Sequence, residues 1–535
     1  MDSSRANQDG RGYRPPHRAA AAAALVVALV YLPALDAGFV NWDDGTYVTS
    51  DPLGKAAVSA FATIHPSGNW HPLATLSHAL DYAVWGPWPA GHHLTSIVLH
   101  GLNAGLVVLL VAALARARQP VRRSAGLAAV VTGLAWGLHP LRVESVVWIS
   151  ERKDLLCALC YLLGLLAYLR GQGPTRRRWY LAAAACLALA LLAKPMAVSF
   201  PLVLLVLDAY PLRRLHRPRL GRVLGEKLPF VVLAAAAALV TLHAQRAGGA
   251  MRALEGVPLL TRTLVAVRSG VLYLGETLFP SGLYALYSYP REVSLGTWQF
   301  VLPLLMLLLL VAAAVQLVRQ LRVFPAALAS YLALLLPILG IVQVGPQAMA
   351  DRYTYLPGIP VALLIGCAFA AVWAETLLPG RRLLAALLGA MLVGLAGLSI
   401  RQMTVWRDSE TLWSWVLEHE PGNAEAYNGR ADYYYRHGRL LDALTDYTAA
   451  LASAPAVGPR HASKRRAAFY NDRAVTLVEL GRLAQAIADE SEALRLRPDQ
   501  PEYYRNRARM YRLLDRMDDA EADGQRARRW SSPRR

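Results

Sequence analysis

Long apolar stretches constrain the fold of this chain more than any other feature. Between residues 19 and 400 it contains about eleven runs of predominantly apolar residues, each close to the roughly 17–25 that an α-helix needs to cross a bilayer. Backbone polar groups must be satisfied within the segment in lipid, so these runs are predicted to be helices. They lie near 19–35, 94–115, 124–139, 153–169, 179–193, 196–212, 228–244, 297–318, 323–342, 354–375 and 383–400. The predicted fold class is therefore all-α, beginning with a polytopic membrane helix bundle over residues 19–400.

The distribution of charge predicts how these spans are oriented. The formal net charge is +19, and residues 1–400 hold 33 Lys and Arg against 17 Asp and Glu, whereas residues 401–535 hold 23 against 20. The basic surplus forms short clusters between spans, which is the positive-inside pattern and not a nucleic-acid-binding surface. Eleven spans then place the N-terminal tail, residues 1–18, in the cytoplasm and the C-terminal domain outside. In a bacterial cell the membrane would be the inner membrane, and we expect the first span to stay as an anchor.

One further segment is left out of this count. Residues 259–280 are moderately apolar but carry Arg262, Arg268 and Glu276. We predict an interfacial or re-entrant amphipathic helix on the non-cytoplasmic face, because an additional span would reverse the later basic clusters.

The C-terminal domain, residues 401–535, contains an internal repeat. Units near 424–457, 467–500 and 501–534 share spaced Tyr, Gly, Ala and Pro residues. The spacing matches the roughly 34-residue tetratricopeptide repeat, a helix–turn–helix unit that stacks into an α-solenoid with a concave groove for a peptide. Residues 409–423 are predicted to be the second helix of a preceding half repeat.

Ionisable residues gather in the loops predicted to lie outside. The first external loop, residues 36–92, carries Asp43 and Asp44 in GFVNWDDGTYV. The stretch 139–154, predicted to be an amphipathic helix on the membrane surface, carries Arg152 and Lys153, and further cations are Lys194 and Arg352. Such groups are costly at a membrane boundary unless they are solvated or paired, which makes them functional candidates. Glycosyl transfer from a lipid phosphate needs this combination: a carboxylate to accept the proton of the acceptor hydroxyl, and cations to stabilise the leaving phosphate.

Several stretches together resemble the transmembrane-and-tetratricopeptide-repeat O-mannosyltransferases and their bacterial relatives, which are GT-C class glycosyltransferases. They are FVNWDDGTYV, WHPLATLSHALDYAVWG, GHHLTSIVLHGLNA, HPLRVESVVWISERKDLL, AKPMAVSFPLVLLVLDAYPL and DRYTYLPG. The resemblance implies a GT-C-like membrane domain and an enzyme that transfers a sugar from a lipid-phosphate donor to a hydroxyl, usually of Ser or Thr in a protein. It does not settle the sugar; we expect mannose, carried by a polyprenyl phosphate. A single displacement would invert the anomeric carbon. The acidic motif that GT-C enzymes carry in their first external loop corresponds to Asp43 and Asp44.

The candidate site residues follow from the loops and from this resemblance. Asp43 and Asp44 are the predicted catalytic pair, with Asp44 narrowly preferred as the base; a simple turn is the alternative. The pair could also hold a divalent metal, and the cofactor is otherwise left open. The predicted ligands of the donor phosphate are Arg152, Lys153, Lys194 and Arg352, although Arg152, Lys153 and Arg352 could be interfacial snorkelling residues. Glu144 and His139 are candidate supporting residues whose preferred role is to cap the surface helix; His71, His92 and His93 are expected at surface or boundary positions.

Two other functions stay open at this point. The chain could be a non-catalytic membrane-anchored scaffold, or a lipid-linked glycan polymerase or ligase whose acceptor is a glycan. The expected partners are the membrane-embedded, lipid-linked sugar and an acceptor protein held by the repeats, with no nucleic acid.

Overall fold

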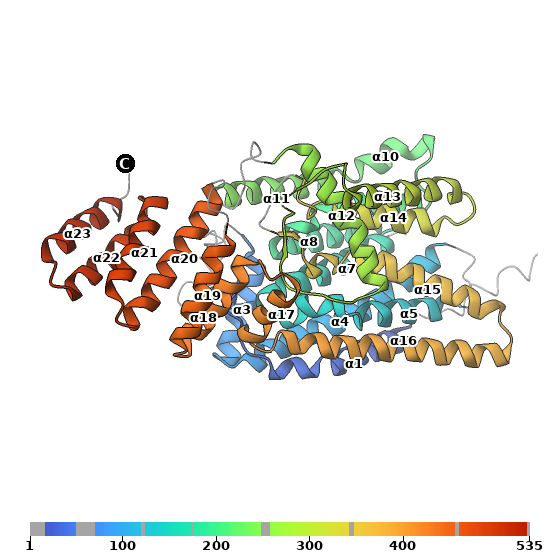
Figure 1. Cartoon of the computed structure of the whole chain (residues 1–535). Coiled ribbons are helices and arrows are strands. Elements are labelled where there is room, and N and C mark those ends of the chain that lie inside the picture. The colour runs from blue at the N-terminus through green and yellow to red at the C-terminus, as the bar shows by residue number, and fades with distance from the viewer. Residues whose placement is uncertain are drawn as a thin grey trace, which may run out of the picture.

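The protein consists of a helix bundle followed by stacked helical pairs, as the computed structural model shows (Figure 1). The structure describes residues 16–49, 70–118, 124–172, 175–247, 257–290, 292–341, 347–454 and 460–531. The predicted all-α class is confirmed. Within the described residues the only sheet is a short antiparallel pair of β1 (Tyr287–Ser288) and β2 (Gln347–Met349).

Each of the predicted apolar runs contains a helix. The helices of the bundle are α1 (His17–Val30), α3 (Pro72–Trp85), α4 (Pro89–Ala117), α5 (Ala125–Gly137), α6 (Val143–Val147), α7 (Arg152–Arg170), α8 (Arg176–Ala193), α9 (Phe200–Ala209), α10 (Leu220–Gly225), α11 (Leu228–Ala247), α12 (Leu259–Leu278), α13 (Trp298–Leu317), α14 (Val323–Leu335), α15 (Gly358–Glu375) and α16 (Leu378–Val405). Six helices among the described residues are long and apolar enough to cross a membrane, and three more apolar helices are shorter. The count of about eleven spans is therefore not confirmed.

The basic clusters and the candidate loops lie at opposite ends of the bundle. At one end, Arg214 and Lys227 pair with Asp208, at 2.9 and 2.6 Å, while Arg176 pairs with Glu226. At the other end, the loop that carries Asp43 contacts the repeat domain, where Asn41 donates to the Gly429 carbonyl, and Glu151 pairs with both Lys194 and Arg352. The separation agrees with the charge pattern of the sequence.

One segment differs from the sequence expectations. Residues 139–151 are not a surface helix: they form two 3₁₀ turns, Pro140–Arg142 and Ile149–Glu151, around α6, and all are buried. Their charged side chains are paired inside the protein, which removes the reason for them to face the membrane surface. The segment near 259–280 forms the continuous helix α12, which packs against α13, and its Arg262 donates to the Ile341 carbonyl.

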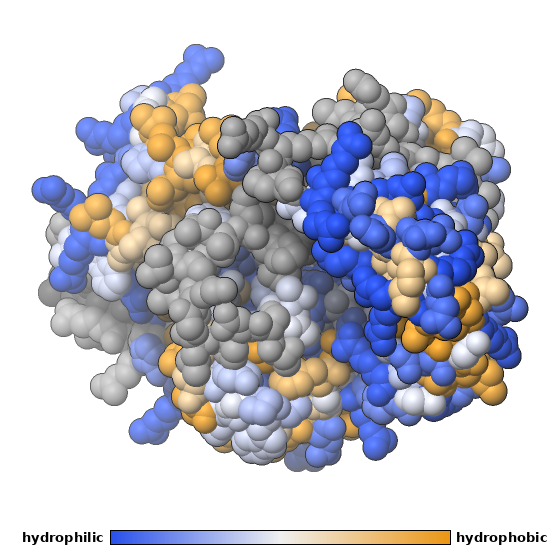
Figure 2. All heavy atoms as spheres, turned by 90° about the vertical axis from the view of Figure 1, so that its left-hand side faces the viewer, coloured by the Kyte–Doolittle hydropathy of each residue, from blue (hydrophilic) through white to orange (hydrophobic). Residues whose placement is uncertain are grey.

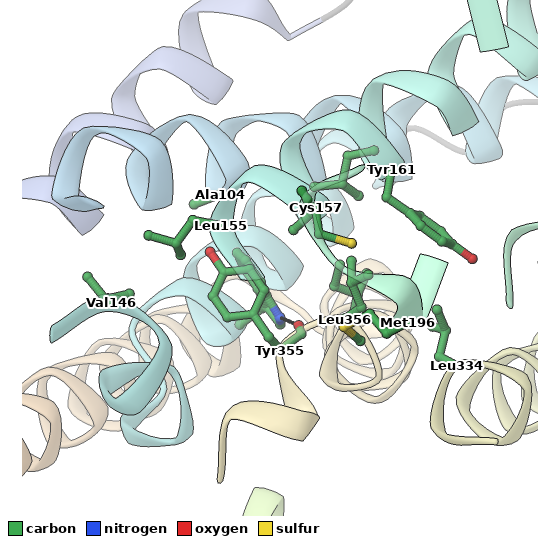
Figure 3. Packing of buried hydrophobic residues seen from close by; sticks show 14 of the residues in the cluster. Ala104, Val146, Leu155, Cys157, Tyr161, Met196, Leu334, Tyr355 and Leu356 are labelled. Carbon is green, nitrogen blue, oxygen red and sulfur yellow. Dashed lines mark hydrogen bonds between the residues drawn. The ribbon is translucent and has the colours of Figure 1, made fainter. Parts of the chain in front are cut away.

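The bundle core surrounds Tyr355 (Figure 3). The Tyr355 hydroxyl lies 2.7 Å from His100 Nδ1 and accepts from the Asn103 amide at 3.2 Å, while its carbonyl accepts from the Trp136 indole at 2.8 Å. Apolar side chains from α4, α7 and α14 enclose this ring. Buried polar groups require such partners, so the network fixes the segment that carries Arg352 against two helices, α4 and α5.

The C-terminal part forms the predicted helical pairs. They are α18 (Ala424–Arg436) with α19 (Leu440–Ser453), α20 (Arg460–Glu479) with α21 (Leu483–Leu496), and α22 (Pro501–Leu513) with α23 (Met517–Ser531). The preceding half repeat is α17 (Ser409–His419), capped by the Asp408 side chain. Trp413 and Val416 of α17 belong to the same hydrophobic cluster as the bundle core, so the repeats are joined to the bundle by continuous packing.

A repeated ion pair joins the two helices of each pair. The guanidinium groups of Arg430, Arg473 and Arg507 bind Asp446, Asp489 and Asp523 through two contacts each, at 2.6–3.0 Å. Each pair is separated by 16 residues. Sequence reasoning missed this feature, which the constant spacing of Arg and Asp could have revealed.

We expect Asp489→Ala to destabilise the central repeat. Removal of the carboxylate leaves the part-buried Arg473 guanidinium without its two charge-assisted hydrogen bonds, at a cost of about 1–3 kcal/mol. Limited proteolysis of the full chain in detergent should show earlier cleavage in the repeats. The exposed Asp442→Ala is the control, and equal resistance of both variants would contradict this role.

Candidate functional site

Asp44 is fully buried and holds two loops together. One carboxylate oxygen accepts from the Val40 amide at 3.0 Å, and the other accepts from the Ser150 amide at 3.0 Å and from the Ser150 hydroxyl. Burial raises the pKa of Asp44 to about 6, against the lowering effect of Ser150 and Val40. Since these donors occupy both oxygens, Asp44 ties the loop after α1 to the 3₁₀ turn Ile149–Glu151 that precedes α7.

Asp43 has a different environment although it is the neighbouring residue. Its side chain is only half-buried, and its carbonyl accepts from the amides of Thr46 and Tyr47 in the short π-helix Gly45–Thr49. Within the described residues, no hydrogen bond or ion pair involves the Asp43 carboxylate, which interacts electrostatically with Lys153. The geometry thus favours Asp43 over Asp44 as the group able to accept a proton, the reverse of the narrow preference from the sequence.

Three of the four predicted cations surround one carboxylate. Glu151 Oε1 lies 3.1 Å from Lys153 Nζ and 3.2 Å from Arg352 Nε, and its Oε2 lies 3.1 Å from Lys194 Nζ. Burial raises the pKa of Glu151, but the three cations outweigh it and hold the pKa well below its usual range. The structure brings these three cations together, and we call Lys153, Lys194 and Arg352 the cation cluster. Glu151 lies at its centre, which the sequence analysis did not identify.

Further carboxylates complete the cluster. Lys194 Nζ also binds Asp154 at 2.6 Å, and Arg352 pairs with Glu144, which accepts from the Arg352 backbone amide at 2.8 Å as well. Glu144 therefore orients Arg352 and does not cap a surface helix. Lys153 has one carboxylate contact, and Nη2 of Arg352 makes no hydrogen bond to a described residue, so these two cations retain donor capacity.

The backbone explains where Lys194 lies. Helix α8 ends at Ala193 because Pro195 disfavours helical geometry in the residue before it, and Lys194 is extended, with φ −155° and ψ 132°. This exit turns the side chain toward the start of α7. The Cys157 thiol donates to the Lys194 carbonyl at 3.8 Å, so Cys157 is a packing residue.

Arg152 does not join the cation cluster. Its guanidinium is fully buried, pairs with Asp81 and donates to the His92 carbonyl at 2.8 Å. The prediction that Arg152 binds the donor phosphate is therefore at odds with the structure. Successive side chains on a helix point about 100° apart, so Arg152 and Lys153 of α7 face different directions. His92 and His93 are also buried in this region, against the expectation of surface positions.

His139 caps the buried 3₁₀ turn Pro140–Arg142 and not the surface helix that the sequence analysis expected. Its Nδ1 accepts from the Leu141 amide at 3.2 Å, and its Nε2 lies 3.0 Å from the Thr277 carbonyl of α12. No contact joins it to the cation cluster within the described residues.

A stack of tryptophans forms one wall of the site. Trp42, next to Asp43, stacks on Trp148 with ring centroids 4.3 Å apart, and Trp406 and Trp413 extend the group. The Arg352 guanidinium lies 5.6 Å from the Trp42 ring and 5.2 Å from the Trp148 ring. Sequence analysis did not identify this stack; its local signal is the position of Trp42 beside the two aspartates.

The surroundings of Asp44 disfavour a metal ion at its carboxylate. Both oxygens of Asp44 face N–H and O–H donors, whose partial positive charge opposes a cation at the same place. The described residues contain no group of three His, Cys, Asp or Glu side chains able to hold a metal.

An apolar cavity of about 200 Å³ lies inside the bundle. It is lined mainly by Leu, Val and Ala side chains of α4, α5, α7, α9, α14 and α15. At one end are Arg118 and Tyr210, near the basic clusters; at the other are Leu356, four residues after Arg352, and Tyr161, whose hydroxyl contacts Ser199. The cavity lining thus includes residues from the basic end of the bundle and Leu356 from the segment that carries Arg352.

Comparisons with known proteins bear on both parts of the chain. The tetratricopeptide repeat family model matches residues 401–457 and 471–533. Protein O-mannosyl-transferase Tmtc1 of Drosophila melanogaster is 31% identical over 162 residues, covering 28% of this chain and 18% of that protein. Protein O-mannosyl-transferase Tmtc2 of the same organism is 32% identical over 206 residues, covering 34% of this chain and 20% of that protein. The resemblance predicted from the sequence is confirmed, and the chain spans about one fifth of the length of these curated relatives.

The crystal structure of ArnT from Cupriavidus metallidurans bound to undecaprenyl phosphate is similar over 90% of this chain and 79% of that chain. Its sequence identity is 19% and its TM-score 0.36, which is too low to support a statement about the present chain.

Proposed function

We propose that the protein is an integral-membrane glycosyltransferase that moves a sugar from a polyprenyl-phosphate donor to a Ser or Thr hydroxyl of a polypeptide. The observation that carries the proposal is the cluster of Lys153, Lys194 and Arg352 around Glu151, beside the half-buried Asp43. Mannose is the proposed sugar, because the matched relatives are named protein O-mannosyl-transferases.

In this proposal Asp43 is the general base. Its carboxylate takes the proton of the acceptor hydroxyl while that oxygen attacks the anomeric carbon, and the bond to the lipid phosphate breaks in the same displacement, with inversion. Arg352 and Lys153 hold the departing phosphate with their remaining donors, and Lys194 keeps Glu151 and Asp154 in place. No step requires a metal.

The apolar cavity supports a lipid-linked donor. Most of its lining is aliphatic, and it includes Leu356 from the segment that carries Arg352. A polyprenyl chain placed there would bury apolar surface at about 25 cal/mol per Å², while its phosphate reached Arg352. A donor without a lipid tail would gain nothing from this cavity.

The proposed sidedness places the repeats and the cation cluster on the non-cytoplasmic face. The physical basis is that the basic clusters gather at the opposite end of the bundle. We expect protease added to inside-out membrane vesicles to leave residues 401–535 intact, whereas protease added from the periplasmic side should remove them. Cleavage of the repeats in inside-out vesicles would reverse the proposed orientation.

Two alternatives are separated by their acceptors. A scaffold predicts that the repeats on an unrelated membrane anchor restore function in cells that lack the protein. A glycan polymerase or ligase predicts that labelled sugar appears on a saccharide. Labelled sugar on a Ser or Thr side chain, with no rescue by the anchored repeats, supports the proposed function.

A further inference from the structure

A cavity lies between the bundle and the first repeat, directly beside the candidate catalytic loop. It measures about 250 Å³ and is lined on the bundle side by Asn41, Trp42, Ser288 and Gln347, and on the repeat side by Trp413 and Asn428. Trp42 is the residue before Asp43, and its ring also stacks on Trp148 in the wall of the site. One residue therefore contributes to both the cavity and the proposed catalytic centre.

The lining carries the chemistry that a peptide main chain needs. Asn41 is held rigidly: its amide donates to the Gly429 carbonyl at 2.7 Å and to Asp432 at 3.0 Å, and its oxygen accepts from the Trp413 indole at 2.7 Å. The Asn428 Oδ1 is buried and has no hydrogen-bond partner among the described residues. A buried acceptor without a donor is costly, and the N–H of an entering chain would satisfy it.

The amide groups continue beyond the cavity. Helices α18, α20 and α22 are neighbours, and Asn506 of α22 donates to Asn471 of α20 at 2.8 Å, while Asn471 donates to Asp472 at 3.0 Å. Seen from the repeat-domain end, the surface carries many hydrophilic residues next to apolar patches (Figure 2). Asn side chains both donate and accept, so they can pair with main-chain groups whatever the sequence of the peptide.

We propose that this junction cavity is the subsite for an extended segment of the acceptor polypeptide, bound through its main-chain N–H and C=O groups. The inference rests on the proposed function, since only a polypeptide acceptor would use such a site. The cavity is bounded by the bundle on one side and by the repeats on the other, so it suits a chain segment that enters from the repeats. The predicted specificity is for unfolded or extended Ser- and Thr-containing chains.

Peptide binding to the full chain tests the proposal without any sugar donor. The protein is placed in lipid nanodiscs and titrated against a fluorescent pool of short unstructured peptides, each with one Thr, with anisotropy as the readout. Asn428→Ala and Gln347→Ala, on the two sides of the cavity, are each expected to weaken binding about tenfold. Gln525→Ala, an exposed amide on α23, is the matched control and should bind as the wild type does.

The outcomes separate the two proposals. Wild-type affinity in both cavity variants, with unchanged melting temperatures, would overturn the subsite even if transfer to peptide occurs. Tight peptide binding that depends on Asn428 and Gln347, in a protein that transfers no sugar, would leave the subsite standing and contradict the proposed function. Equal weakening by Gln525→Ala would also overturn it, since the effect would not depend on the cavity.

Discussion

Asp43→Asn is expected to lower the turnover number for sugar transfer by about 10²–10⁴-fold, the usual contribution of a positioned general base. The carboxylate makes no hydrogen bond or ion pair among the described residues, so the variant should insert, fold and melt as the wild type does. The measurement is transfer of labelled sugar to a peptide at saturating donor and acceptor. The same preparation reports the melting temperature, which separates lost chemistry from lost structure.

Asp44→Asn is the matched comparison because it makes the same change one residue away. An amide nitrogen would then face either the Val40 or the Ser150 donors, so the loop loses its attachment to the start of α7. We expect transfer and melting temperature to fall together in this variant. If Asp44→Asn kept its stability and lost all transfer, while Asp43→Asn stayed active, the assignment of the two roles would be reversed.

Neutralisation of Arg352 together with Glu144 is expected to lower kcat/KM for the lipid-phosphate donor by about 100-fold or more. Loss of charge-assisted hydrogen bonds to phosphate is worth roughly 1.5–3 kcal/mol each. The double variant Arg352→Gln with Glu144→Gln leaves no unpaired buried charge, and the new amide side chain that replaces Glu144 keeps an oxygen for the backbone N–H of residue 352. Steady-state kinetics at varied donor concentration gives the result.

The double variant tests whether Arg352 binds the donor phosphate or only forms a structural ion pair with Glu144. If the Arg352–Glu144 pair only stabilises the fold, replacing both charges at once should leave kcat/KM for the donor unchanged, because a compensated buried pair is often neutral for stability. Arg507→Gln with Asp523→Asn applies the same treatment to an ion pair of the third repeat. That control should keep the donor KM of the wild type.

The sequence predicted the apolar runs, the repeats and the loops of the site, because these depend on local patterns of period and composition. It could not separate Asp43 from Asp44. The two residues have the same chemistry, and only the path of residues 38–49 turns one carboxylate toward Ser150 and leaves the other half-buried. The sequence also could not predict the role of Arg152, because its ion-pair partner Asp81 is distant in sequence.

The central position of Glu151 is also visible only in the folded structure. A carboxylate beside Arg152 and Lys153 looks locally like one member of a charged stretch. Its contacts with Lys194 and Arg352 arise only when the start of α7, the exit from α8 and the segment before α15 meet. The tryptophan stack likewise joins residues from both domains, which no local pattern reports.

The most direct test of the central claim is sugar transfer by the purified full chain. The protein in nanodiscs is incubated with a radiolabelled polyprenyl-phosphate mannose and a Thr-containing peptide, and the product is mapped by mass spectrometry. The account predicts one hexose on the Thr side chain, formed by the wild type and lost in Asp43→Asn. No modified peptide from a folded, donor-binding wild type, or equal modification by Asp43→Asn, would contradict it.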